Sequence, residues 1–191
     1  MSSQQNLILS LYSSPQTVFT LAGIALAYQD EAVSPLSRRL NYYVQRGRLL
    51  NLRRGIYAKP GYNPEELACQ LYTPCYLSLE YVLQRAGVVF QYDSQLTAVG
   101  YLSRTIDIDG REYAYRQIKG TILSNLQGIE QRANNINIAT PERAFLDVLY
   151  LNKEYHFDNL HPLHRRQVEA LLPIYRSRRL TERVANLFDA K

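Results

Sequence analysis

The chain has 191 residues, of which 46% are hydrophobic, so it can bury one good core or two modest cores of roughly 60 and 130 residues. No stretch approaches the ~20 consecutive apolar residues of a membrane span, and the polar start at 1–6 lacks the basic and apolar segments of a secretion signal. Cys69 and Cys75 are two lone cysteines in a chain with ample core, which favours buried thiols over a disulfide. We therefore expect a cytoplasmic protein without a membrane partner.

The formal net charge of +5 is concentrated at one end of the chain. Residues 1–60 hold 7 Lys/Arg against 2 Asp/Glu, whereas residues 61–191 hold 15 of each. A charge excess that is confined to one segment creates a local positive field, which attracts a polyanion without making the whole surface adhesive. We therefore expect the N-terminal segment to bind nucleic acid.

Three helices are predicted in this segment. Apolar spacing and end signals indicate helices at 6–12, 21–28 and 35–46, with a short extended link at 17–19 and a turn at 29–32. Thr20 is predicted to cap the second helix and Ser34 the third, because a side-chain oxygen at this position accepts a hydrogen bond from a free N–H group of the first turn. Gly47 is predicted to end the third helix.

The third helix has one apolar face and one polar face. At about 100° per residue, Val33, Leu36, Leu40, Tyr43 and Val44 fall on the core-facing side. The opposite and flanking positions carry Ser34, Ser37, Arg38, Arg39, Asn41, Tyr42, Gln45 and Arg46. Arg, Asn and Gln match the hydrogen-bonding edges of guanine and adenine in the major groove. We interpret this polar face as one that contacts DNA bases, with an ordinary solvated helix face as the alternative.

After Gly47 the sequence pattern becomes extended. Strands are predicted at 48–53 and 56–60, joined by a tight turn in which Gly55 supplies a positive φ. Arg53 and Arg54 lie at the tip of this hairpin, and Arg48 and Lys59 lie on its strands. Basic side chains on such a hairpin can reach the phosphate backbone or the minor groove. The sequence therefore predicts a winged helix-turn-helix domain at 1–62 that binds double-stranded DNA.

A second, α+β domain is predicted at 63–191. Short helices are expected at 63–71 and at 78–87, the latter capped by Ser78. Antiparallel hairpins are expected at 105–118 and 129–139, and packed helices at 140–149, 162–172 and 180–188, of which the first begins at Thr140 and Pro141. Strands that are bracketed by helices favour an α+β architecture.

The second domain carries no evident catalytic or metal-binding motif. Glu142 is explained as an acid in the first turn of a helix, and Arg143 and Asp147 as an i,i+4 ion pair. His161 and His164, near His156 and Asp158, lack a third ligand at a defined spacing. A Gly-rich phosphate loop and a nucleophile elbow are also missing. We therefore expect a protein that is not an enzyme and that uses no cofactor or metal.

The C-terminal segment differs in charge from the segment before it. Residues 160–191 hold 7 Lys/Arg against 3 Asp/Glu, whereas residues 61–159 hold 8 against 12. Three arginines lie around one predicted helix boundary (Arg176, Arg178 and Arg179), and Arg183 follows in the helix predicted at 180–188. Two interpretations stay open, namely a solvated helix surface or a second electropositive face that binds an acidic protein partner or more DNA.

Three segments of the chain resemble one known family. Residues 36–57, with Gly47-Arg48-Leu49 and Arg53-Arg54-Gly55-Ile56-Tyr57, resemble the winged-helix N-terminus of AbiEi-type antitoxins. Residues 76–83, between Pro74 and Gly87, are similar to the "P-x-Y-x-S-L" segment that follows in that family. Residues 138–147 are similar to its "S/T-P-E-R-A-L-L-D" segment. The similarity covers about 60% of the chain, in the same order.

This resemblance implies a DNA-binding transcriptional autorepressor that is also the antitoxin of an abortive-infection toxin–antitoxin module used in phage defence. Its partners would be double-stranded DNA of its own promoter and a nucleotidyltransferase-like toxin, and it would act as a monomer or a weak dimer on repeated operator sites. Two alternatives stay open. The chain could be a winged-helix regulator with a ligand-sensing domain, or a nuclease or nucleotide-processing enzyme guided by the winged helix.

Overall fold

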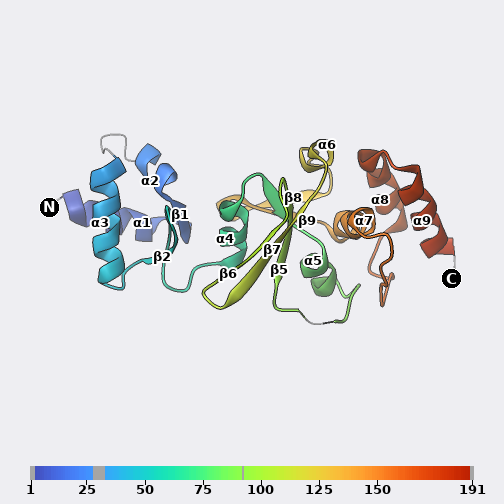
Figure 1. The fold of residues 1–191 in the computed structure, drawn as a ribbon, viewed down its shortest axis with the longest axis horizontal. Coiled ribbons are helices and arrows are strands. Elements are labelled where there is room, and N and C mark those ends of the chain that lie inside the picture. The colour runs from blue at the N-terminus through green and yellow to red at the C-terminus, as the bar shows by residue number, and fades with distance from the viewer. Residues whose placement is uncertain (1–2, 28–32, 92, 190–191) are drawn as a thin grey trace. The chain divides into compact units, whose positions relative to one another are not determined.

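A computed structural model describes residues 3–27, 33–91 and 93–189 and shows a mixed α/β protein with two sheets (Figure 1). The chain divides into two compact units, Met1–Leu71 and Tyr72–Lys191. Within the described ranges, no helix combines the length and the apolar character that crossing a membrane requires.

The first unit combines four helices and three strands among its described residues. In chain order these are α1 (Ser3–Ser13), β1 (Val18–Thr20), α2 (Leu21–Ala27), α3 (Val33–Gln45), β2 (Leu50–Arg53), β3 (Ile56–Ala58) and α4 (Pro64–Leu71). The sheet has the order β1-β3-β2, and both pairs are antiparallel. The predicted helices and the predicted hairpin are confirmed. The link predicted at 17–19 is more than a connection, because β1 adds a third strand to the hairpin.

The core of the first unit lies between its helices and this sheet. Leu36 and Leu40 of α3 are completely buried, and Tyr43 is nearly so. Leu7 and Leu11 of α1 pack into the same cluster. The predicted core face of α3 is thus confirmed for these residues, so burial of one side of the helix holds its opposite side at the surface.

Local signals fix several ends of these elements. The Thr20 hydroxyl accepts a hydrogen bond from the Gly23 amide at 3.0 Å, which confirms the predicted cap of α2. Gly55 has a φ of 78° in the turn between β2 and β3. The helix α3 begins at Val33, so the prediction that Ser34 is its N-cap was two residues or more too late. The predicted turn at 29–32 and the side chains of Val33 and Ser34 lie outside the described residues.

The helix α4 belongs to the first unit, whereas the predicted boundary at 62/63 placed it in the second. The reason is a buried carboxylate. Glu66 accepts hydrogen bonds from the Thr17 and Val18 amides at 3.0 Å and from the Thr17 hydroxyl at 2.7 Å. Gln70 adds a hydrogen bond to the Val18 carbonyl at 2.9 Å. These contacts fasten α4 to the start of β1.

The second unit is built on a six-stranded sheet. Its strands are β4 (Cys75–Leu77), β5 (Leu96–Gly100), β6 (Arg104–Ile108), β7 (Arg111–Gln117), β8 (Ile129–Arg132) and β9 (Ile136–Ala139). Their order is β6-β7-β5-β4-β9-β8. The two predicted hairpins, β6–β7 and β8–β9, are confirmed and form the two edges. Each joins the central antiparallel pair β4–β5 through a parallel contact.

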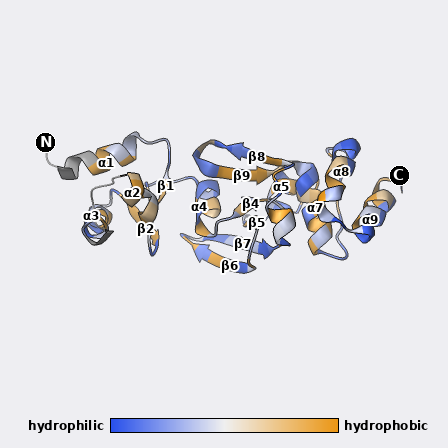
Figure 2. Ribbon diagram, turned by 90° about the horizontal axis from the view of Figure 1, so that it is seen from above, coloured by the Kyte–Doolittle hydropathy of each residue, from blue (hydrophilic) through white to orange (hydrophobic). Residues whose placement is uncertain are grey.

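Helices complete the second unit. They are α5 (Glu80–Arg85), α6 (Gly120–Leu123), α7 (Pro141–Leu151), α8 (Arg165–Leu171) and α9 (Arg178–Asp189), with short 3-10 turns η1 (Ala133–Asn135) and η2 (Leu172–Tyr175). The predicted start of α7 at Thr140 and Pro141 is confirmed, and Thr140 caps this helix by accepting a hydrogen bond from the Arg143 amide at 3.3 Å. In α9, Leu180 and Val184 are buried, and Figure 2 shows polar and apolar residues on this helix.

One prediction in this unit was wrong. Ser78 was expected to cap a helix at 78–87, but residues 75–77 form β4, and α5 begins at Glu80 without a side-chain cap. The Ser78 hydroxyl instead donates a hydrogen bond to Asp147 at 2.8 Å. A buried carboxylate needs donors, and it takes the hydroxyl that a helix cap would otherwise use.

Candidate nucleic-acid interface

The polar side of α3 forms the centre of the candidate interface. Arg38, Asn41, Tyr42, Gln45 and Arg46 are exposed. Ser37 and Arg39, which were predicted to flank this face, are half-buried. Because the opposite side of α3 is locked into the core, these side chains project from a rigid helix. Five of these seven predicted residues are thus exposed, and the other two are half-buried.

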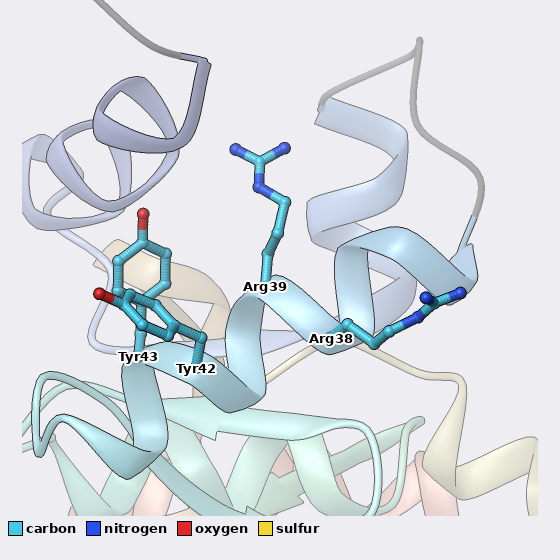
Figure 3. Close-up of a pocket in the computed structure, with 4 residues that line it drawn as sticks. All are labelled: Arg38, Arg39, Tyr42 and Tyr43. Carbon is cyan, nitrogen blue, oxygen red and sulfur yellow. The ribbon is translucent and has the colours of Figure 1, made fainter.

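A pocket of about 310 Å³ opens beside α3 and is lined by Arg38, Arg39, Tyr42 and Tyr43 (Figure 3). Figure 3 shows Arg38 and Arg39 leaving the helix in different directions. The Tyr42 and Tyr43 rings meet edge to face with centroids 5.5 Å apart. The Arg46 guanidinium lies 5.3 Å from the centre of the Tyr42 ring, in the range of a cation–π contact. This part of α3 thus combines positive charge with aromatic surface.

Asn41 is linked to the sheet behind the helix. The Tyr57 hydroxyl donates a hydrogen bond to Asn41 Oδ1 at 3.3 Å. Tyr57 lies in β3 and is only 3% exposed, whereas Asn41 is exposed. A side chain at the surface is therefore held by a phenol that is itself fixed in the core.

The hairpin β2–β3 follows α3 directly. Arg53 and Arg54 are exposed at its turn, where Arg53 pairs with Ile56. Arg48 is exposed before β2, and its carbonyl accepts a hydrogen bond from the Tyr12 hydroxyl at 2.6 Å. The tip and the base of the hairpin therefore both present arginines to solvent.

Lys59 occupies a different environment from these arginines. Its ammonium donates hydrogen bonds to the carbonyls of Ser14 at 2.6 Å and Tyr12 at 3.3 Å. It also lies 5.7 Å from the centre of the Phe19 ring. A cation at the end of a helix is stabilised by the negative end of the helix dipole, which here belongs to α1. The contacts of Lys59 are thus internal to the unit, although the sequence pattern grouped it with the hairpin arginines.

The four tail arginines of the second unit also differ from one another. Arg178 pairs with Glu182 at 2.9 Å, and Arg183 donates to the carbonyls of Asn152 and Lys153 at 2.9 Å. Arg176 and Arg179 are exposed, and Arg176 adopts a left-handed φ of 47° after η2. Of the four arginines of the predicted partner face, three are therefore exposed (Arg176, Arg178 and Arg179), and two have contacts within the unit (Arg178 and Arg183).

The predicted i,i+4 pair of α7 is confirmed, but it lies in the centre of a buried network. Arg143 Nε and Asp147 Oδ1 are 3.5 Å apart, and both side chains are completely buried. Asp147 accepts hydrogen bonds from the hydroxyls of Tyr76 at 3.0 Å, Ser78 at 2.8 Å and Tyr175 at 2.6 Å. Arg143 donates to Tyr76 at 3.2 Å and to two backbone carbonyls. This network ties β4, α7 and η2 together.

Burial governs the protonation of this network. It raises the pKa of the Asp147 carboxyl, while the Arg143 charge and the three hydroxyl donors act in the opposite direction. Burial and the adjacent Asp147 charge raise the pKa of Tyr76 and Tyr175 well above the usual value for tyrosine. The phenols therefore remain protonated and continue to donate hydrogen bonds.

Sequence analysis identified only two members of this network. Tyr76 and Ser78 come from a segment 71 and 69 residues before Asp147, and Tyr175 lies 28 residues after it. Contacts between residues that are so far apart along the chain leave no periodic pattern in the sequence. Tyr76 and Ser78 lie in the second segment that resembles the family, and Arg143 and Asp147 lie in the third. The resemblance of these two segments was the one indication in the sequence that they belong together.

The remaining chemical candidates stay apart. Within the ranges that the structure describes, no three His, Cys, Asp or Glu side chains are close enough to hold a metal ion. His156 Nε2 lies 4.0 Å from Asp158, and the His164 amide donates to Glu142. Cys69 and Cys75 are buried thiols.

Compared with known proteins, the chain matches no family model and no curated protein.

Proposed function

We propose that the first unit is a winged helix-turn-helix domain that binds double-stranded DNA, and that the chain is a transcriptional autorepressor. The observation that carries this proposal is the placement of the α3 polar face next to a hairpin tipped with arginines. The element order α1-β1-α2-α3-β2-β3, with β1 as the third strand of the sheet, supports it. In this arrangement α3 enters the major groove and the hairpin follows the backbone.

The exposed residues then divide between two tasks. Arg38, Asn41 and Gln45 have the donors and acceptors that base edges require. Arg53 and Arg54 at the hairpin turn are suited to phosphates, since a charged guanidinium binds phosphate oxygens without regard to sequence. Ser37, Arg39, Arg46 and Arg48 flank these groups and serve to position the domain on the duplex.

We propose further that the second unit makes the chain an antitoxin of an AbiE-like module that opposes a nucleotidyltransferase-like toxin. The support is the family resemblance of residues 76–83 and 138–147, whose side chains meet in the buried network. Complete burial of Arg143 and Asp147 favours a structural role over catalysis, because no substrate reaches side chains with 0% exposure. Arg176 and Arg179 are the exposed candidates for contact with the toxin.

Salt dependence tests the DNA-binding proposal. If Arg46, Arg48, Arg53 and Arg54 each contact one phosphate, the slope of log affinity against log salt is about −3.6 for four contacts. Raising salt from about 50 to about 200 mM then weakens binding of the full chain roughly 150-fold. Arg54→Ala should flatten the slope by about 1 on every duplex. Arg178→Ala, whose side chain pairs with Glu182, is the matched control. Affinity that is independent of salt would refute the proposal.

The antitoxin proposal needs a cellular test. Cells that express the toxin encoded beside this gene should survive when the full chain is also expressed. Arg176→Ala combined with Arg179→Ala should reduce survival if these side chains contact the toxin, while repression of the promoter stays unchanged. Absence of a nucleotidyltransferase-like neighbour, or death of cells that express the folded parent chain, would contradict the antitoxin proposal and leave the repressor proposal intact.

A further inference from the structure

We infer that Asn41 selects an adenine in the major groove and that Tyr57 is the positioning residue that holds it for this task. The inference rests on the proposed DNA binding of the first unit and adds the base that is recognised and the residue that sets the specificity. Tyr57 does not touch DNA in this scheme. It acts through the amide of Asn41.

Tyr57 is held in place by the three-stranded sheet of the first unit. Tyr57 is the central residue of β3, where it pairs with Phe19 of β1 on one side and with Asn51 of β2 on the other. Strands on both sides and 3% exposure leave this side chain little freedom. Its hydroxyl is therefore a fixed hydrogen-bond donor, and it reaches Asn41 Oδ1 at 3.3 Å.

The chemistry of the amide follows from this contact. An asparagine that reads adenine must accept from the N6 amino group and donate to N7, so its oxygen and its amino group must each face the correct atom. A carbonyl oxygen has two lone pairs, and the Tyr57 hydroxyl occupies one of them. The other lone pair stays available for N6, and the amino group stays available for N7. The contact thus restrains the amide without consuming the groups that recognition needs.

Restraint of the Asn41 side chain before binding should have a measurable effect on affinity. A side chain that is already held loses less rotational freedom when it binds, so more of its contact contributes to affinity. Guanine presents two acceptors, O6 and N7, at the same edge and offers no donor to the amide oxygen. Discrimination by one such bidentate contact corresponds to about 5- to 150-fold in affinity.

Tyr57→Phe is the informative variant, because it removes only the hydroxyl and leaves the ring in the core. Asn41 is exposed, so its oxygen can bind water after the change and the fold loses little. A merely structural tyrosine would alter binding to all duplexes alike. A positioning tyrosine alters the preference at one base pair.

The experiment uses the full chain and a library of random duplexes. Selection gives the base preferences of the parent, and a preferred duplex is then synthesised with 7-deazaadenine, which lacks the N7 acceptor, at each adenine in turn. We expect one position at which this replacement weakens parent binding about 10-fold. Asn41→Ala should abolish both the adenine preference and the 7-deazaadenine effect there. Tyr57→Phe should reduce both several-fold and leave the salt slope unchanged.

The outcomes separate the inference from the function on which it rests. If the parent binds duplexes in a salt-dependent way and Asn41→Ala keeps every base preference, the inference is wrong and the DNA-binding proposal stands. If Asn41→Ala removes the adenine preference but Tyr57→Phe does not change it, the role of Tyr57 is wrong. A parent chain that binds no duplex at all overturns both. Arg54→Ala, which should weaken all duplexes alike, is the control for a general loss of affinity.

Discussion

Asp147→Ala should destabilise the second unit more than any surface substitution, because it breaks an ion pair whose two side chains are completely buried. The change leaves the Arg143 guanidinium in the core without a counter-charge. It also removes the acceptor of three hydroxyl hydrogen bonds, from Tyr76, Ser78 and Tyr175. Removing one partner of a buried pair typically costs about 3–5 kcal/mol. Domains of ordinary stability unfold with about 5–15 kcal/mol, so about a fifth or more of the stability is at risk.

Urea unfolding of the full chain measures this effect. The chain has no tryptophan and 16 tyrosines, so far-UV circular dichroism and tyrosine emission are suitable signals. Arg178→Ala serves as the control, since it breaks an exposed i,i+4 pair with Glu182 and should not change the midpoint measurably. Asp147→Asn keeps the volume but removes the charge that balances Arg143 and turns an amino group toward hydroxyls that donate to the parent carboxylate, so it should also destabilise the unit.

A double variant distinguishes a broken pair from a general loss of packing. Replacing a whole buried pair by apolar side chains is often neutral, whereas removing one partner is not. Arg143→Met with Asp147→Leu should therefore recover part of the stability that Asp147→Ala loses. An Asp147→Ala chain within about 1 kcal/mol of the parent, with an unchanged dependence on urea, would refute the argument that an unpaired buried guanidinium is costly here.

Three further predictions concern pH and the first unit. Because the pKa of Tyr76 and Tyr175 is raised in the folded state, the contribution of these two phenols to the free energy of unfolding should be constant below about pH 10 and fall above it, where unfolded tyrosines ionise. Replacing both by Phe should flatten this decline at alkaline pH in urea titrations, and an unchanged profile would contradict it. A fragment that ends at residue 62 lacks Glu66 and should melt at a lower temperature than the complete first unit; equal melting would show that α4 is dispensable. Lys59→Ala should lower the melting temperature but leave the salt slope of DNA binding unchanged, and a flatter slope would return Lys59 to the DNA contacts.

The sequence predicts the parts of this fold that depend on near neighbours. The period of α3, the hairpin at 105–118 and the start of α7 at Thr140 and Pro141 are all encoded within a few residues, and each is confirmed. In all three cases one local interaction or backbone preference decides the structure. Composition and spacing are then sufficient evidence.

The features that the sequence does not predict depend on contacts between distant residues. The strand β1 pairs with β3 across about 40 residues, and Glu66 binds Thr17 across 49. Ser78 has the chemistry of a helix cap but serves Asp147 instead. A local sequence pattern cannot show which distant acceptor will take a given hydrogen-bond donor. The boundary between the units and the buried network of Asp147 are therefore visible only in the three-dimensional structure.

The net charge of each unit depends on where the boundary between the units lies. Moving the boundary from residue 62 to Leu71 adds Glu65 and Glu66 to the first unit, so its count becomes 7 Lys/Arg against 4 Asp/Glu, and that of the second unit 15 against 13. The net charge per unit therefore no longer separates them clearly. What does separate them is distribution. Residues 33–62 hold all 7 basic residues of the first unit and no acidic one, and Glu66 is buried against backbone amides. A phosphate near α3 and the hairpin meets arginines without competing carboxylates in that segment, whereas the tail arginines Arg178 and Arg183 already have internal partners. The local arrangement, more than the total charge, makes the first unit the better candidate for binding a polyanion.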